Sequence, residues 1–207
     1  MKTALKSVAH GIAILVILPL LVTHRFAAIL VGADTSLESH SQLLSLAPGI
    51  TGSYLRVAFY RFALQHCDPS ATISFGTLFS KTTAVIERNV YIGPRCMLGD
   101  VTLEEDVLLG PAVQVPSGPN THGFESLETP IRLQRGQKRH ITIGRDSWVG
   151  ASAIVLADIS AQCVVGAASV VTKATAPRSI VVGNSAKRVA WRGDSGNPND
   201  NGNTNVS

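Results

Sequence analysis

Residues 115–141 form a polar stretch whose side chains could act on a hydroxyl group. The stretch carries His122, Glu125, Glu128, Arg132 and Arg135. An imidazole with an ordinary pKa of about 6.5 takes a proton from an alcohol near neutral pH, so His122 is a candidate general base. A carboxylate on the other ring nitrogen would orient the base, and Glu125, then Glu128, lie nearest in sequence. A backbone carbonyl in that orienting role, or a solvated histidine without a catalytic role, are the alternatives.

A six-residue repeat surrounds this stretch and must position it. The steps read ISFGTL, FSKTTA, IERNVY, IGPRCM, LGDVT, LEEDVL and LGPAVQ, and after the interruption IGRDSW, VGASAI, VLAD, ISAQCV, VGAASV and VTKATA. The first position is almost always Ile, Leu, Val or Phe, and the fifth is small or short. This period predicts a solenoid of short parallel strands, with the first residue inside and the fifth near a corner. Glycine at the second position is expected to supply turn conformations that a Cβ resists.

Composition excludes several classes of protein. A chain of 207 residues suits one domain with appendages. The formal charge is +4 without a dense run of Lys or Arg, so no nucleic-acid face is expected, and anionic small molecules or a membrane surface are the expected partners. Cys67, Cys96 and Cys163 are widely spaced, which predicts neither a disulfide framework nor a zinc site. Cys96 and Cys163 occupy the small fifth position and are expected in the core.

Residues 1–33 are expected to associate with a membrane. Lys2 and Lys6 precede the apolar run GIAILVILPLLV, and His24 and Arg25 close it. A spanning helix needs about 20 apolar residues, so the run favours an interfacial or re-entrant helix with its cations at lipid headgroups. A spanning helix, a cleaved signal peptide and a helix buried in a protein interface are the alternatives.

The rest of the chain divides into three parts. Residues 34–72 are a helical linker and cap, in which Tyr54 to Leu64 is amphipathic, with one face made of Leu55, Ala58, Phe59, Phe62 and Ala63. Arg56 and Arg61 are expected within reach of lipid phosphate. Residues 73–192 form the solenoid with its excursion loop, and the polar tail 193–207 is expected to be disordered.

The repeat, the histidine-bearing loop, the return ITIGRDSWVGASAIVLAD and the ending VVGAASVVTKATAPRSIVVGNSAKRV resemble the hexapeptide-repeat acyltransferases over residues 70–192. The segment LSLAPG to YLRVAFYRFAL further resembles O-acetyltransferases of bacterial exopolysaccharide and lipopolysaccharide pathways. The resemblance implies a mainly β fold, a left-handed parallel β-helix, a homotrimer with active sites between protomers, and acetyl-CoA as donor.

The resemblance also implies roles for particular residues. His122 is the general base, the acceptor hydroxyl attacks the thioester directly, and backbone N–H groups near Trp148–Ala151 stabilise the oxyanion. The expected coenzyme A site is made of small residues beside Trp148 and of cations for the phosphates: Trp148, Gly150, Ala151, Ala167, Ala168, Lys173, Arg178, Lys187 and Arg188. The ending here is Asn184-Ser185-Ala186-Lys187, where the family has Asn-Pro-Ala-Lys, so Lys187 is expected to be less firmly placed.

These features predict an acetyltransferase that modifies a hydroxyl of a sugar or lipid-linked glycan at the cytoplasmic face of the bacterial inner membrane. No metal is expected. A small soluble acceptor of the serine or antibiotic type, and a non-enzymatic β-helical scaffold tethered to a membrane, are the alternatives. A β-helical carbonic anhydrase is disfavoured, because only His122 and His140 lie near the repeat.

Overall fold

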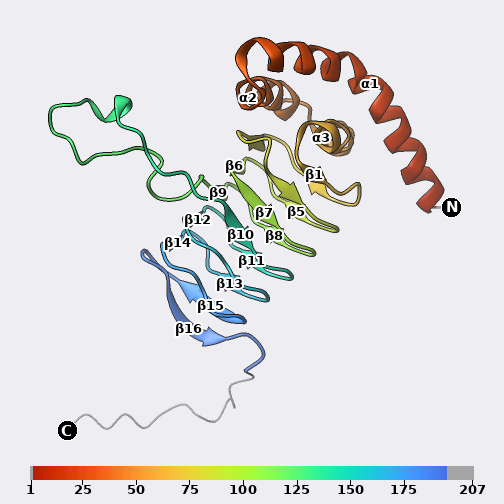
Figure 1. Ribbon diagram of the computed structural model, residues 1–207. Helices are drawn as coiled ribbons and strands as arrows, with labels where there is room; N and C mark the ends of the chain where they lie inside the picture. Colours follow the sequence, from red (N-terminus) through yellow and green to blue (C-terminus); the bar gives the residue numbers. More distant parts are fainter. Residues whose placement is uncertain (1, 195–207) are drawn as a thin grey trace, which may run out of the picture.

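The structure is a computed structural model that describes residues 2–194. Three helices, α1 (Lys2–Val31), α2 (Ala33–Ser45) and α3 (Gly49–Ala63), cap one end of a parallel β-helix (Figure 1). The predicted class, mainly β with a left-handed parallel β-helix and an N-terminal helical segment, is confirmed. The predicted polar tail lies outside the described residues from position 195 onward.

Three parallel sheets form the faces of the β-helix. Face A contains β1 (His66–Cys67), β4 (Val85–Ile86), β7 (Val101–Leu103) and β10 (Ile141–Ile143). Face B contains β2 (Thr72–Ile73), β5 (Tyr91–Ile92), β8 (Leu108–Leu109), β11 (Trp148–Val149), β13 (Val164–Val165), β15 (Ser179–Val182) and β16 (Lys187–Trp191). Face C contains β3 (Leu78–Phe79), β6 (Met97–Leu98), β9 (Gln114–Val115), β12 (Ile154–Val155) and β14 (Val170–Val171). β16 folds back antiparallel onto β15 at the C-terminal end of face B.

The repeat places one aliphatic residue of each step in the interior. On face B, Ile73, Ile92 and Leu109 lie in register on successive strands, and all three are fully buried. The fourth position of the step turns the corner, and at nine such positions a residue other than glycine has a positive φ, from Asn89 to Arg178. Cys96 and Cys163 are buried as predicted, and burial raises the pKa of the Cys96 thiol to about 11.

The role predicted for the second-position glycines is wrong. Gly93, Gly110, Gly144 and Gly150 are not among the residues with positive φ. A Cβ on Gly150 would lie 2.5 Å from the Ala167 nitrogen, and one on Gly144 would lie 2.5 Å from the Ala161 nitrogen. These glycines are therefore required because the backbone of the next coil passes too close for a side chain.

The corner between face C and face A, called the variable corner below, absorbs the irregularities of the repeat. The inward residue recurs there after steps of unequal length, from Phe79 to Ile86, Leu98 to Leu103, Val115 to Ile143 and Val155 to Ile159. The excursion loop is the long step of this series. The long first step also corrects one prediction: Ala84 is buried in place of Thr83, and the Thr83 hydroxyl faces outward.

The helical cap is locked to the solenoid by a buried cation. Arg56 of α3 is completely buried. Its Nε donates to the Ile73 carbonyl at 2.9 Å, and its Nη1 donates to Leu44 and Ala47 at the C-terminal end of α2, at 3.1 and 2.7 Å. The prediction that Arg56 reaches lipid phosphate is therefore wrong. A cation suits this place because carbonyl groups at a helix C-terminus carry partial negative charge.

The buried faces of α1 and α3 also differ in part from the prediction. Phe62 of α3 is 43% exposed, whereas Val57 and Tyr60 are buried. α1 continues through His24 and Arg25, because His24 is buried and bonds Ser36 of α2 at 2.9 Å. As a result, Val8–Val31 has the length and composition of a membrane-crossing helix, with a mean hydropathy of 2.3 over a window that is 17% buried.

We expect Arg56→Leu to lower the free energy of unfolding by about 3 kcal/mol, because it leaves buried carbonyl groups without donors. Arg61→Leu changes an exposed side chain of the same helix and should change that energy by less than about 0.5 kcal/mol. Urea unfolding of both variants measures the difference. Equal stability of the two would contradict the role assigned to Arg56.

Candidate active site

The excursion loop is a narrow antiparallel ribbon at its base. Arg139 N–H donates to the Ser117 carbonyl at 2.9 Å, Gln137 N–H donates to Asn120 at 2.7 Å, and His122 pairs with Arg135 in an antiparallel bridge. The two strands of the ribbon cross so closely that a Cβ on Gly136 would lie 2.4 Å from the His122 nitrogen. The backbone of His122 is thereby fixed, while the loop projects away from the solenoid (Figure 1).

The predicted partner of His122 is not joined to it. Glu125 Oε2 accepts from the Phe124 N–H at 3.1 Å, and no hydrogen bond links Glu125 or Glu128 to His122 within residues 2–194. His122 itself is exposed. The imidazole is therefore held through its backbone, and a carboxylate partner for its ring is not supplied by this part of the chain.

A groove of about 320 Å³ opens at the foot of the loop. Its floor is apolar, with Leu78, Met97 and Val115 from face C, whereas its rim is polar. The rim includes Glu38 of α2, Lys81, Gln114, Ser117, Thr121 and Lys138. Thr121 directly precedes His122, so the candidate base lies beside this groove. The sequence gave no sign that α2 contributes Glu38, because that residue is distant in the chain.

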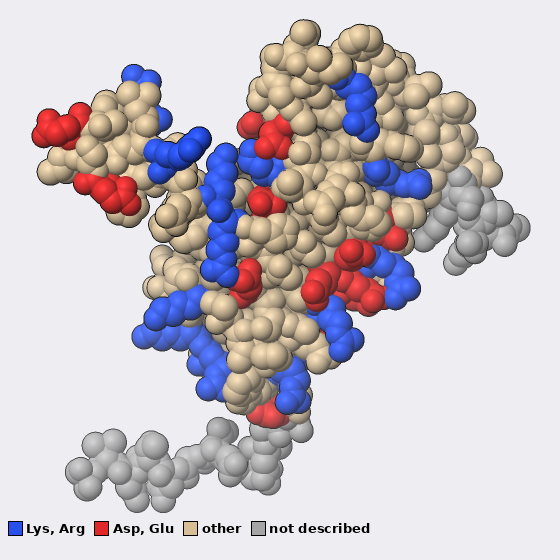
Figure 2. Space-filling view, in the orientation of Figure 1, with Lys and Arg blue, Asp and Glu red and all other residues tan. Residues whose placement is uncertain are grey.

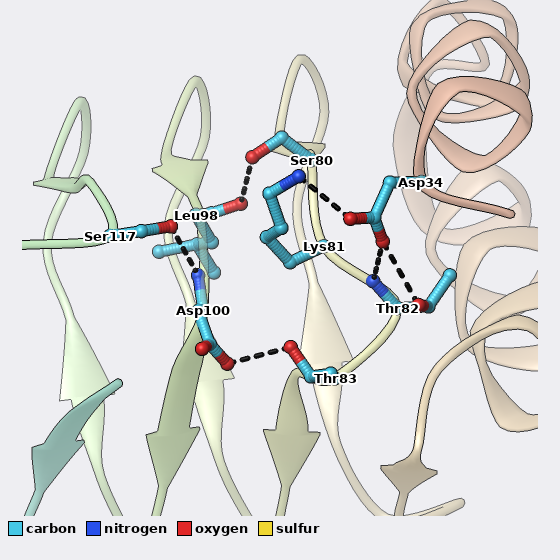
Figure 3. Close-up of polar contacts among 8 residues, drawn as sticks. All are labelled: Asp34, Ser80, Lys81, Thr82, Thr83, Leu98, Asp100 and Ser117. Atoms are coloured by element: carbon cyan, nitrogen blue, oxygen red, sulfur yellow. Dashed lines mark hydrogen bonds and ion pairs between the residues drawn. The ribbon is translucent and has the colours of Figure 1, made fainter. Parts of the chain in front are cut away.

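Polar contacts run along the variable corner from the cap to the loop (Figure 3). Asp34 of α2 accepts from Lys81 Nζ at 2.7 Å and from the Thr82 N–H and hydroxyl at 2.9 Å each. On the next coil, Asp100 accepts from the Thr83 hydroxyl at 2.6 Å. The cap and the coils beneath the loop are therefore joined along one edge.

Asp100 also contacts His140, the last loop residue before β10. His140 Nδ1 lies 2.7 Å from Asp100 Oδ1, and His140 Nε2 lies 2.8 Å from the Thr102 hydroxyl. Burial raises the pKa of Asp100, but hydrogen bonds from Thr83 and His140 outweigh burial and hold that pKa below its ordinary value. Sequence reasoning considered His140 only as a metal ligand. The five-residue step LGDVT was the signal that this corner is special.

The residues predicted to hold the donor lie on another part of the solenoid. Trp148 is 53% exposed on face B, whereas the loop leaves the corner between faces C and A, opposite face B. One chain therefore does not bring His122 and Trp148 together. The smallness of Gly150 is explained by coil stacking, and Ala168 is an exposed corner residue with a φ of 56°.

One backbone donor near Trp148 remains available. The Trp148 N–H donates to the Cys163 carbonyl, and the Gly150 N–H donates to the Val165 carbonyl. Ala151 lies at the corner after β11, and its N–H donates to no carbonyl in the described part of the chain. The structure thus narrows the predicted oxyanion donors among these three N–H groups to that of Ala151.

The predicted phosphate-binding cations lie at the C-terminal end of the solenoid. Lys173, Arg178, Lys187 and Arg188 are all exposed. Figure 2 shows Lys and Arg side chains gathered at this end of the molecule. The Arg188 guanidinium stacks 3.9 Å from the centre of the Trp191 ring, which orients it without neutralising it. No cluster of three metal-ligating side chains occurs among the described residues.

Comparisons with solved structures define the class of fold. A maltose O-acetyltransferase from Clostridium difficile matches 77% of this chain and 88% of its own, with a TM-score of 0.65 and 16% identity. A hexapeptide-repeat acetyltransferase from Vibrio cholerae matches 76% and 92%, with a TM-score of 0.60 and 18% identity. The N-acyltransferase AntD from Bacillus cereus, in complex with dTDP and coenzyme A, matches 59% and 70%, with a TM-score of 0.52 and 15% identity. The predicted resemblance to hexapeptide-repeat acyltransferases is confirmed at the level of the fold.

The sequence adds one relative. Nodulation protein L of Rhizobium leguminosarum bv. viciae is 32% identical over 98 residues, which are 46% of this chain and 44% of that protein. The chain thus spans less than half the length of this curated relative. No family model matches the sequence.

Proposed function

We propose that the protein is an acyl-CoA-dependent O-acetyltransferase that modifies a hydroxyl of a sugar or lipid-linked glycan in surface polysaccharide biosynthesis. The observation that carries the proposal is His122, fixed on a rigid ribbon beside a groove, in a fold shared with acyltransferases. The coenzyme A in the AntD complex supports an acyl-CoA donor, and the maltose O-acetyltransferase supports a sugar acceptor.

In this mechanism His122 removes the proton of the acceptor hydroxyl while its oxygen attacks the thioester carbon. The Ala151 N–H donates to the developing oxyanion. The tetrahedral intermediate then expels the coenzyme A thiolate, which takes the proton from the His122 imidazolium. The products are an acetyl ester and free coenzyme A, and no acyl-enzyme forms. Glu125 stays a candidate for orienting His122 only through a movement of the loop.

The groove at the foot of the loop is the proposed place of the acceptor. Its apolar floor suits the face of a sugar ring, and the side chains of Glu38, Lys138 and Gln114 offer hydrogen bonds to hydroxyl groups. Coenzyme A is proposed to lie along face B, with Trp148 and Gly150 beside the pantetheine arm. Its phosphates then meet Lys173, Arg178, Lys187 and Arg188.

We propose a homotrimer because the base and the donor residues lie on opposite sides of one chain. The loop of one subunit would bring His122 to Trp148 and Ala151 of its neighbour. The far end of the loop suits such a contact, since Leu127 is 97% exposed and Phe124, Ile131 and Leu133 are also exposed. An apolar surface on a projecting loop is typical of a protein contact.

The outward side of α1 supports association with a lipid bilayer. The exposed apolar residues of this helix are Ile12, Leu15, Val16, Leu18, Val22, Phe26, Ile29 and Leu30. α1 packs on α2 and α3 through its other side, so we propose an interfacial helix at the cytoplasmic face of the bacterial inner membrane. Arg25 donates to the Phe62 carbonyl at 2.9 Å, which leaves Lys2 and Lys6 as the proposed headgroup contacts.

His122→Ala should lower kcat by about 100- to 10,000-fold because the hydroxyl loses its base. Binding of acetyl-CoA should not change, since His122 does not hold the donor. The measurements are thiol release with maltose and polyprenyl-phosphate-linked sugars as acceptors, and calorimetric titration with acetyl-CoA. His66→Ala, an exposed histidine on β1, is the control. Unchanged turnover would remove His122 from the mechanism.

Leu127→Asp combined with Ile131→Asp should convert trimer to monomer and abolish turnover, because charges replace the apolar contact. Light scattering measures the mass, and Val182→Asp, an exposed change on face B, is the comparison for loss of the opposite side. A wild-type protein that is monomeric at working concentration would refute the shared site.

Ile29→Asp combined with Leu30→Asp should abolish flotation with vesicles of phosphatidylethanolamine and phosphatidylglycerol, because both residues are over 80% exposed on α1. Val189→Asp on β16 is the matched control. Flotation that persists in the double variant would contradict docking through α1.

Two alternatives keep separate outcomes. Turnover with small soluble acceptors, and none with glycans, would favour the serine or antibiotic type. Failure of the folded protein to bind acetyl-CoA would favour the scaffold.

A further inference from the structure

Asp100 bonds both ends of the excursion loop at its neck. Its backbone N–H donates to the Ser117 hydroxyl at 3.1 Å, and its carboxylate lies 2.7 Å from His140 Nδ1. Ser117 opens the loop and His140 closes it. We propose that Asp100 and His140 are positioning residues that hold the loop so that His122 meets the acceptor hydroxyl. The inference rests on the proposed function, because that function makes His122 the base.

The loop has few other connections to the solenoid. Within residues 2–194, hydrogen bonds and ion pairs tie residues 116–140 to the solenoid only through Ser117, Arg139 and His140. Arg139 pairs with Asp158, which itself accepts from the Thr142 N–H at 2.9 Å. The orientation of the whole ribbon is therefore set at its neck.

Asp100 suits this role because its own position is fixed. The Thr83 hydroxyl donates to the same carboxylate oxygen at 2.6 Å, and Thr83 faces outward because the step before it is one residue longer than the repeat. Gly99 allows Ser117 to come close, since a Cβ at that position would lie 2.7 Å from the Ser117 hydroxyl. Two irregular steps of the repeat thus build the clamp.

His140 is held at both ring nitrogens. With its Nδ1–H donating to Asp100, its Nε2 accepts from the Thr102 hydroxyl at 2.8 Å, an assignment of the tautomer that follows from the carboxylate. A ring fixed in this way defines the direction in which the chain enters β10. It also leaves no ring nitrogen for proton transfer to a substrate.

The order hydroxyl, imidazole and carboxylate is also that of an acyl-transfer triad. Thr102, however, lies within β7, which is paired with β4 on one side and β10 on the other. The groove at the foot of the loop is lined by Gly99 and Ser117 but not by Thr102. The geometry therefore favours a clamp over a nucleophile.

A small rotation at the neck would displace the base. The ribbon is stiff where Gly136 crosses Thr121, so movement of Ser117 and Arg139 carries His122 with it. A displacement of about 1 Å costs about 100-fold in rate when the reacting groups must be aligned.

Asp100→Ala should therefore lower kcat by about 10- to 100-fold with an unchanged KM for acetyl-CoA. Asp100→Asn, whose amide oxygen still accepts hydrogen bonds, should recover part of the loss, and Glu87→Gln, remote on face A, is the control. Added to His122→Ala, Asp100→Ala should cost nothing more. A further loss in that double variant would show that Asp100 acts independently of His122 and overturn the inference.

Thr102→Val removes only the outer hydrogen bond of His140 and should lose much less turnover than Asp100→Ala. A loss as large as that of His122→Ala would make Thr102 the nucleophile and would also overturn the inference.

Limited trypsin digestion tests the clamp without any turnover. Cleavage after Arg132 and Arg135, followed by mass spectrometry, should be at least about 10-fold faster in Asp100→Ala than in wild type, because the freed loop opens more often. Unchanged cleavage would refute the clamp. Faster cleavage in a protein that binds no acetyl-CoA would keep the clamp and reject the proposed function.

Discussion

The stacking of one coil directly on the next is the constraint on which this structure depends. Parallel strands of neighbouring coils lie about 4.8 Å apart, which leaves no space for a side chain where backbones cross. That spacing explains both the buried aliphatic columns and the glycines at the second position, whose missing Cβ is replaced by backbone of the following coil. A solenoid built in this way tolerates irregular length at one edge only, since an inserted residue on a face would break the register of every coil beyond it.

The variable corner is that edge, and it carries the candidate chemistry. Each coil reaches it through a step of different length, and the polar side chains released there are the ones that bond one another from coil to coil (Figure 3). The excursion loop is an extreme case of the same variation. A long loop placed on such an edge starts from two strands that are already in register, so its ends are held at a fixed separation before the loop itself makes any contact.

The two ends of the solenoid are closed in different ways. The C-terminal end folds back as β16, which covers the edge of β15 with an antiparallel strand. The N-terminal end is covered by helices, and the Arg56 guanidinium joins them to the first coil by bonding carbonyls of both parts. A single rigid body results, in which the apolar outer side of α1, the groove beside α2 and the foot of the loop keep fixed relative positions. A membrane-associated enzyme with a membrane-linked acceptor would need that arrangement.

The sequence by itself determined the solenoid, the buried cysteines, the break at 115–141 and His122 as its candidate base, because a six-residue period reports directly which residues face the interior. It misjudged the glycines and Arg56, and it did not find Asp100, Ser117 or Glu38 as members of the site. These failures have one physical cause: their roles depend on backbone or side chains from other coils and from the cap, which a local period does not encode. Only the tertiary structure brings Thr83, Asp100 and His140 together, because stacking places at one corner residues that are dozens of positions apart in the chain.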